Sequence, residues 1–265
     1  MVEEVPVNEE EKSAPEQPLM AHLLELRDCV LKIIYGIGLV FAPLAYFTKE
    51  IYALTAQPLI NLMPAGTSMI ATEVASPFFV PLKLSAMLAV ALSMPWTLFQ
   101  VWAFVAPGLY KSERKLVAPL LASSTLLFYL GMAMAYFLVL PTVFAFLISV
   151  APEGVAVMTD INKYLSFVLS IFIAFGLAFE TPVAIVLIVR TGFVSPKKLR
   201  ESRAYVLVGA FVVAAVLTPP DVVSQFLLAV PTYLLYELGI IAAVWITPSS
   251  VHMDEDDEEE ARDSA

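Results

Sequence analysis

The chain has 265 residues, of which 59% are hydrophobic and 15% charged, with a mean hydropathy of +0.81. This composition excludes an ordinary soluble domain and indicates a protein that crosses a membrane several times. The net charge of −10 comes from the two ends. Residues 1–20 hold six acids and Lys12, and residues 250–265 hold eight acids and Arg262, so the remaining residues sum to +2. We expect two acidic disordered tails, 1–20 and 250–265, around a transmembrane domain at 21–249.

Several kinds of chemistry are not expected from this sequence. A single cysteine, Cys29, excludes an intrachain disulfide, and no Cys/His set resembles a metal site. No glycine-rich phosphate loop of the G-x-x-x-x-G-K-S/T type occurs, and the two histidines lie near the tails. We therefore expect neither an enzyme nor a resident metal or cofactor.

The first apolar stretch runs from Cys29 to Phe47 and predicts the first span. Directly before it, residues 22–28 alternate leucines with Glu25 and Arg27. This pattern predicts a short amphipathic helix that lies at the membrane surface before the chain enters the membrane. An alternative reading is that Glu25 and Arg27 only anchor the span at the interface. Because the N-terminus is acidic rather than basic, no cleaved signal peptide is expected.

The next three elements are a connection and two spans. Residues 48–76 form the longest polar connection, interrupted by prolines and a glycine at 58, 64 and 66, and are predicted to form an external cap. A second span is expected from Pro77 to Val105. The third, Leu116–Ile148, is long and carries two prolines, which predicts a tilted or kinked helix.

The fourth span, Leu165–Val189, contains one charged residue, Glu180. At about 1.5 Å per residue this stretch is roughly 37 Å long, enough to cross a hydrocarbon layer of about 30 Å. Glu180 lies near mid-membrane, where a carboxylate is costly and usually faces a bundle interior or a wet cavity. The alternative is a packing role for Glu180. Pro182 predicts a bend beside this acid.

The last apolar region, Tyr205–Ile246, is cut by two consecutive prolines within residues 218–221. Either it forms a re-entrant hairpin or it provides a fifth and sixth short span, and we favour two short spans. Loops 106–115 and 190–204 hold eight Lys/Arg, whereas the intervening loops hold Lys49 and Lys163. The positive-inside rule therefore predicts both basic loops and both termini to be cytoplasmic.

Six stretches of this sequence together resemble a known family. They are HLLELR (22–27), MIATEVASPFF (69–79), QVWAFVAPGLYKSER (100–114), APEGV (151–155), FGLAFETPV (175–183) and YVLVGAFVVAAVLTPPDVVSQ (205–225). They resemble the TatC family, the polytopic core of the twin-arginine protein translocase. The resemblance implies an all-α fold of six transmembrane helices arranged as a concave cup in the bacterial cytoplasmic membrane.

The resemblance also implies roles for particular residues. It puts the signal-peptide site at Glu25, Arg27, Phe104 and Glu113, Glu180 on the concave surface, and Thr218 and Gln225 in the region that contacts partner subunits. The implied partners are TatA-like and TatB-like single-span subunits, twin-arginine signal peptides, membrane lipid and further copies in a receptor complex, with no nucleic acid. Export would be driven by the proton motive force, since no ATP site is present.

Two other functions remain open at this stage. One is a proton-coupled membrane carrier that uses Glu180 as its protonation site. The other is a scaffold that gathers single-span membrane proteins. Cross-linking to a twin-arginine precursor would separate the first reading from both of these.

Overall fold

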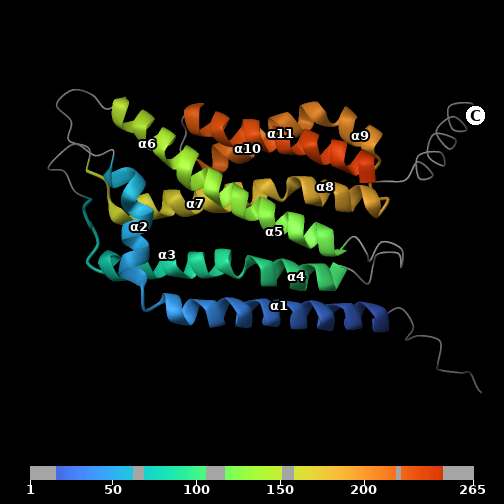
Figure 1. The fold of residues 1–265 in the computed structure, drawn as a ribbon, viewed down its shortest axis with the longest axis horizontal. Helices are drawn as coiled ribbons and strands as arrows, with labels where there is room; N and C mark the ends of the chain where they lie inside the picture. Colours follow the sequence, from blue (N-terminus) through green and yellow to red (C-terminus); the bar gives the residue numbers. More distant parts are fainter. Residues whose placement is uncertain (1–15, 62–68, 106–116, 151–157, 219–221, 247–265) are drawn as a thin grey trace, which may run out of the picture.

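The computed structural model describes residues 16–61, 69–105, 117–150, 158–218 and 222–246, and its regular elements there are all helical (Figure 1). The helices are α1 (Glu16–Leu44), α2 (Thr48–Ile60), α3 (Ser76–Leu92), α4 (Met94–Val105), α5 (Val117–Met134), α6 (Leu140–Ser149), α7 (Ile161–Phe179), α8 (Thr181–Arg190), α9 (Pro196–Glu201), α10 (Arg203–Leu217) and α11 (Val222–Ile246), with a π-helical turn at Ala135–Val139. This confirms the predicted all-α class. Residues 1–15 and 247–265, which make up most of both predicted tails, lie outside the described residues.

The long helices run roughly along one direction, and α2 lies across one end of them (Figure 1). α1 packs mainly on α3 and α4, α5 packs on α7, and α11 packs on α8 and α10. α1 and α10 therefore form the two edges of an open arrangement. The start of α1, the end of α8, α9 and the end of α11 all lie at the end opposite α2 (Figure 1). We call this the α9 end, and the other the α2 end.

Three stretches are long and apolar enough to cross a membrane without a sharp bend: Ala118–Ser149, Ile161–Arg190 and Val222–Ile246. Two bent pairs, α1 with α2 and α3 with α4, would bring that number to five among the described residues. α10 is a shorter apolar helix of 15 residues. The chain is therefore a multipass membrane protein, and the sixth crossing depends on whether α10 spans.

The predicted surface helix at residues 22–28 is wrong as a separate element, because α1 is continuous from Glu16 to Leu44. No proline or glycine separates residues 22–28 from the span that follows, so the hydrogen-bonded helix simply continues. Leu23, Leu24 and Leu26 are all exposed rather than turned to a common protein surface. Pro58, predicted to interrupt the next connection, lies inside α2, while residues 64 and 66 lie outside the described residues.

Irregular points in the helices lie where prolines or polar residues interrupt the spans. α3 and α4 meet at 52°, just before Pro95. The π-helical turn directly precedes Pro141 near the start of α6. The fourth span begins at Ile161, four residues earlier than predicted, because the Asp160 side chain accepts hydrogen bonds from the backbone N–H groups of Asn162 and Lys163.

The last two helices differ in length. α10 is short, as predicted, at about 22 Å for its 15 residues. The prediction that the last span is also short is wrong, because α11 has 25 residues and a length of about 37 Å. Pro231 lies inside α11 without ending it, so the apolar run continues unbroken to Ile246.

Close packing of α5 on α7 depends on Gly131. A Cβ atom built at Gly131 would lie 2.6 Å from the Phe175 backbone oxygen and 2.9 Å from the Phe179 ring. Phe175 is fully buried, and Phe179 nearly so. Gly131 thus lies where the two longest spans, Ala118–Ser149 and Ile161–Arg190, approach each other.

We expect Gly131→Ala to destabilise the protein by about 1–3 kcal/mol, because the added methyl group meets backbone that cannot move aside. Gly38→Ala in α1 is the matched control, since nothing lies within 4 Å of a Cβ built there. Thermal unfolding of both purified variants in detergent should show a lower Tm for Gly131→Ala only. Equal Tm values would contradict the packing role of Gly131.

Candidate functional site

α1 and α4 run antiparallel and are joined by contacts along their length. The Trp96 Nε1–H donates to the Lys32 oxygen at 3.0 Å, and the indole lies against Gly36, where a Cβ would come within 2.4 Å of it. One step nearer the α9 end, the Cys29 thiol donates to the Gln100 oxygen at 3.4 Å. These contacts fix the register between the two helices and bring their α9 ends together.

At those ends lie three of the residues predicted for the signal-peptide site. Glu25 and Arg27 are exposed on α1, and Phe104 is half-buried on α4. His22 contacts two of these residues. Its ring stacks on Phe104 with centroids 4.6 Å apart, and its Nδ1 lies 3.7 Å from a Glu25 carboxylate oxygen. The structure therefore brings an acid and an aromatic ring from two different helices to one surface.

Arg27 has a different immediate partner. Its guanidinium pairs with Asp28, at 3.1 Å from Nη2 to Oδ1, and both side chains are more than half exposed. Exposed pairs of this kind contribute little to stability. Glu113, the fourth predicted residue, lies outside the described residues.

Glu180 occupies the break between α7 and α8. Its backbone closes α7 and opens α8, because Pro182 has no N–H to continue the hydrogen-bond ladder. The Ser124 hydroxyl, from α5, donates to Glu180 Oε2. Glu180 Oε1 is buried and has no hydrogen-bond partner among the described residues. The helix is interrupted beside Glu180, but Ile161–Arg190 still forms one span without a sharp bend, and the hydration of the carboxylate stays a prediction.

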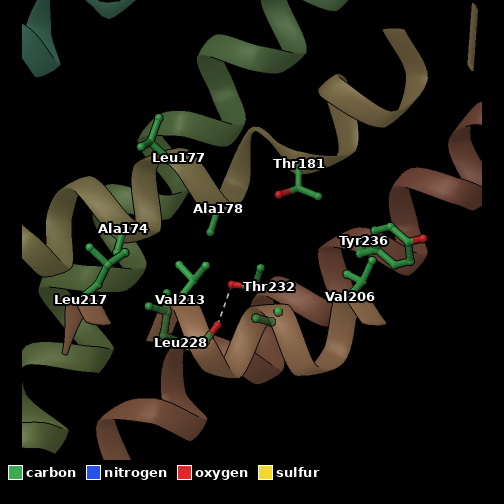
Figure 2. A pocket seen from close by; sticks show the side chains of 12 residues that line it. Ala174, Leu177, Ala178, Thr181, Val206, Val213, Leu217, Leu228, Thr232 and Tyr236 are labelled. Carbon is green, nitrogen blue, oxygen red and sulfur yellow. Dashed lines mark hydrogen bonds between the residues drawn. The ribbon is translucent and has the colours of Figure 1, made fainter. Parts of the chain in front are cut away.

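A cavity of about 430 Å³ opens beside this break, between α7, α8, α10 and α11 (Figure 2). Its lining residues are apolar apart from Thr181, Thr232 and Tyr236. The Thr232 hydroxyl donates to the Leu228 oxygen within its own helix, and the Tyr236 hydroxyl donates to the Leu199 oxygen in α9. Glu180 does not line this cavity, so the cavity is separate from the Ser124 contact.

Thr218 and Gln225, predicted for partner contact, lie where α10 ends and α11 begins, toward the α2 end (Figure 1). Thr218 is only 6% exposed, and its hydroxyl donates to the Ala214 oxygen. Gln225 is partly exposed. Of the two, Gln225 is therefore the one whose side chain reaches the surface.

The α2 end also carries a polar contact between two loops. Asp160 accepts from the Thr72 N–H at 3.0 Å and the Thr72 hydroxyl at 2.7 Å, in addition to capping α7. These hydrogen bonds, led by the Thr72 hydroxyl, lower the pKa of Asp160 from its usual value to about 2. The carboxylate thus stays ionised at neutral pH, and it joins the segment before α3 to the start of α7.

Comparison with known proteins decides the family. Residues 21–231 match the family model described as "Sec-independent protein translocase protein (TatC)". The chain belongs to the TatC family. It is 58% identical to the Sec-independent protein translocase protein TatC of Escherichia coli (strain K12), over 84% of this chain and 87% of that protein. It is 56% identical to the corresponding protein of Azotobacter chroococcum mcd 1, over 86% and 89% of the two chains.

A solved structure agrees with this assignment. The crystal structure of the twin-arginine translocase receptor TatC superposes with a TM-score of 0.75 at 34% identity. The match covers 84% of this chain and 98% of that one. The all-helical membrane fold and the family implied by the sequence motifs are thereby confirmed.

The sequence did not indicate which side chains contact the acids within the spans. Ser124 is one serine among many in apolar spans, and nothing in its local sequence marks it as the donor to Glu180. Glu237 carried no functional hypothesis, yet it accepts from Arg203 at 2.7 Å and from the Tyr233 hydroxyl at 3.1 Å. The first contact joins the consecutive helices α10 and α11, and the second lies within α11.

We expect Glu180→Gln to remain inserted and stable, because the amide oxygen can still accept from Ser124, but to impair export of a folded reporter protein in cells. We expect impaired export because a carboxylate is costly in a membrane span and is usually retained there for function. Ser124→Ala is the matched change: it keeps the carboxylate, removes its donor and should cost about 1–3 kcal/mol of stability. Unimpaired export by Glu180→Gln would instead support the packing role.

Proposed function

We propose that this protein is the core subunit of a twin-arginine translocase and that its α9 end is a cytoplasmic surface that binds twin-arginine signal peptides. The observation that carries the proposal is the surface formed by Glu25 and Phe104, held together through His22 at the paired ends of α1 and α4. A TatC-family protein needs a recognition surface of this kind on the side from which its cargo arrives.

The orientation follows from charge. The five Lys/Arg of residues 190–204 lie in or beside α9, whereas Lys49 and Lys163 lie toward the α2 end. Short basic loops remain on the cytoplasmic side of a membrane. The α9 end is therefore cytoplasmic in our proposal, and because α1 starts and α11 ends there, we propose that both chain termini are cytoplasmic as well.

The chemistry of the surface suits an arginine ligand. A guanidinium pairs with a carboxylate through two parallel hydrogen bonds and also stacks on aromatic rings. Glu25 and Phe104 offer both partners. A lysine ammonium has neither the planar fork nor the stacking surface, so this site should prefer arginine.

Export also requires partners and energy. We propose that single-span TatA-like and TatB-like subunits contact the region of Thr218 and Gln225, and that several copies of the protein assemble in the receptor complex. The sequence contains no nucleotide-binding loop, so the membrane potential, at about 2.3 kcal/mol per charge per 100 mV, is the proposed driving force. The family assignment does not favour the carrier and scaffold alternatives.

We expect Glu25→Ala to bind a twin-arginine peptide roughly tenfold to a hundredfold more weakly than wild type, because a guanidinium loses its charged acceptor. Glu25→Lys should be weaker still, since it adds repulsion. The measurement is a titration of the purified protein in detergent with a labelled twin-arginine peptide and with its twin-lysine version. Wild type should prefer the arginine form, and Glu25→Ala should lose most of that preference.

Glu50→Ala is the matched control, because Glu50 is an exposed acid at the α2 end. It should bind both peptides as wild type does. If Glu25→Ala also binds the arginine peptide as wild type does, Glu25 is an interface anchor and the proposed site is wrong.

A further inference from the structure

His22 contacts both Glu25 and Phe104. Its ring stacks on Phe104 at an interplanar angle of 23°, an arrangement that aromatic pairs favour. Its Nδ1 lies 3.7 Å from Glu25 Oε2, which is within ion-pair range but too long for a hydrogen bond. His22 therefore contacts, from one side chain, both groups that a guanidinium would need.

Stability alone does not account for this arrangement. The side chains of His22 and Glu25 are 60% and 64% exposed, and an exposed pair on one helix contributes little to folding. The α1–α4 register is already fixed deeper in the protein by the contacts of Trp96 and Cys29. The fold does not need His22 to hold α1 against α4.

We propose that His22 is a positioning residue of the signal-peptide site: its stacked ring fixes the plane of Phe104 beside the Glu25 carboxylate, so that both are in place before an arginine arrives. The inference rests on the proposed function of this surface and deepens it. A ring and a carboxylate that are already oriented bind a ligand more tightly, because less side-chain freedom is lost on binding.

The test is a set of peptide titrations with the full-length protein in detergent. His22→Ala should bind the twin-arginine peptide roughly three- to tenfold more weakly than wild type, the range expected for losing one aromatic pair. His22→Phe can still stack on Phe104 and should remain within about twofold of wild type. Tyr35→Ala removes an aromatic ring from the exposed side of the same helix and should bind as wild type does.

A double-mutant cycle separates positioning from a direct contact between His22 and the peptide. Once Phe104→Ala has removed the ring, changing His22 to Ala as well should weaken binding less than twofold further. A full and independent loss in the double variant would overturn the positioning role. So would wild-type binding by His22→Ala, or a loss by Tyr35→Ala as large as that of His22→Ala.

These outcomes are distinct from failure of the proposed function. If Glu25→Ala weakens binding while His22→Ala does not, the site stands and the role of His22 is wrong. If neither change affects binding and wild type does not prefer the arginine peptide, the proposed site itself is wrong. If His22→Ala unfolds at a lower temperature than wild type, His22→Phe becomes the deciding variant. Binding by His22→Phe as weak as binding by Glu25→Ala then overturns the proposal.

Discussion

A membrane interior contains no water to satisfy polar groups, so every polar group within a span needs a partner from the protein. One oxygen of Glu180, Oε2, meets this constraint through the Ser124 hydroxyl of α5, and Gly131 lets α5 approach α7 closely. The break between α7 and α8, required by Pro182, lies at the same point. The centre of the fold is thus set by one acid, the donor to one of its oxygens and the glycine at which α5 and α7 approach each other.

The same constraint explains why the proposed recognition surface lies at one end of the protein. Acids and arginines that must meet a charged peptide cannot be kept within the hydrocarbon, where they would be costly. Glu25, His22 and Arg27 are instead exposed at the end of α1, where α4 brings Phe104 beside them. Contacts deeper in the α1–α4 pair hold these ends together, so the exposed charged side chains are not needed for helix packing.

Much of this structure could be predicted from the sequence, because hydrophobic length and proline position are local signals. The all-helical class, the irregular turn before Pro141 and the break beside Glu180 follow from them directly. The continuity of α1 and the length of α11 were misjudged, since a polar stretch or a single proline need not end a helix that is stabilised by tertiary packing. The Ser124–Glu180 contact and the His22–Phe104 stack could not be found this way, because each joins helices whose pairing the sequence does not encode locally.

The central claim is that the α9 end faces the cytoplasm and binds the signal peptide, and site-specific photo-cross-linking tests it most directly. A photoreactive phenylalanine analogue at Leu24 probes the exposed surface beside Glu25, and the same analogue at Val74 probes a still more exposed position toward the α2 end. In membrane vesicles with the cytoplasmic face outward, a twin-arginine precursor should cross-link to position 24 and not to position 74. Excess twin-arginine peptide should abolish the product, and its twin-lysine version should not. Cross-linking at position 74 without any at position 24 would contradict the account.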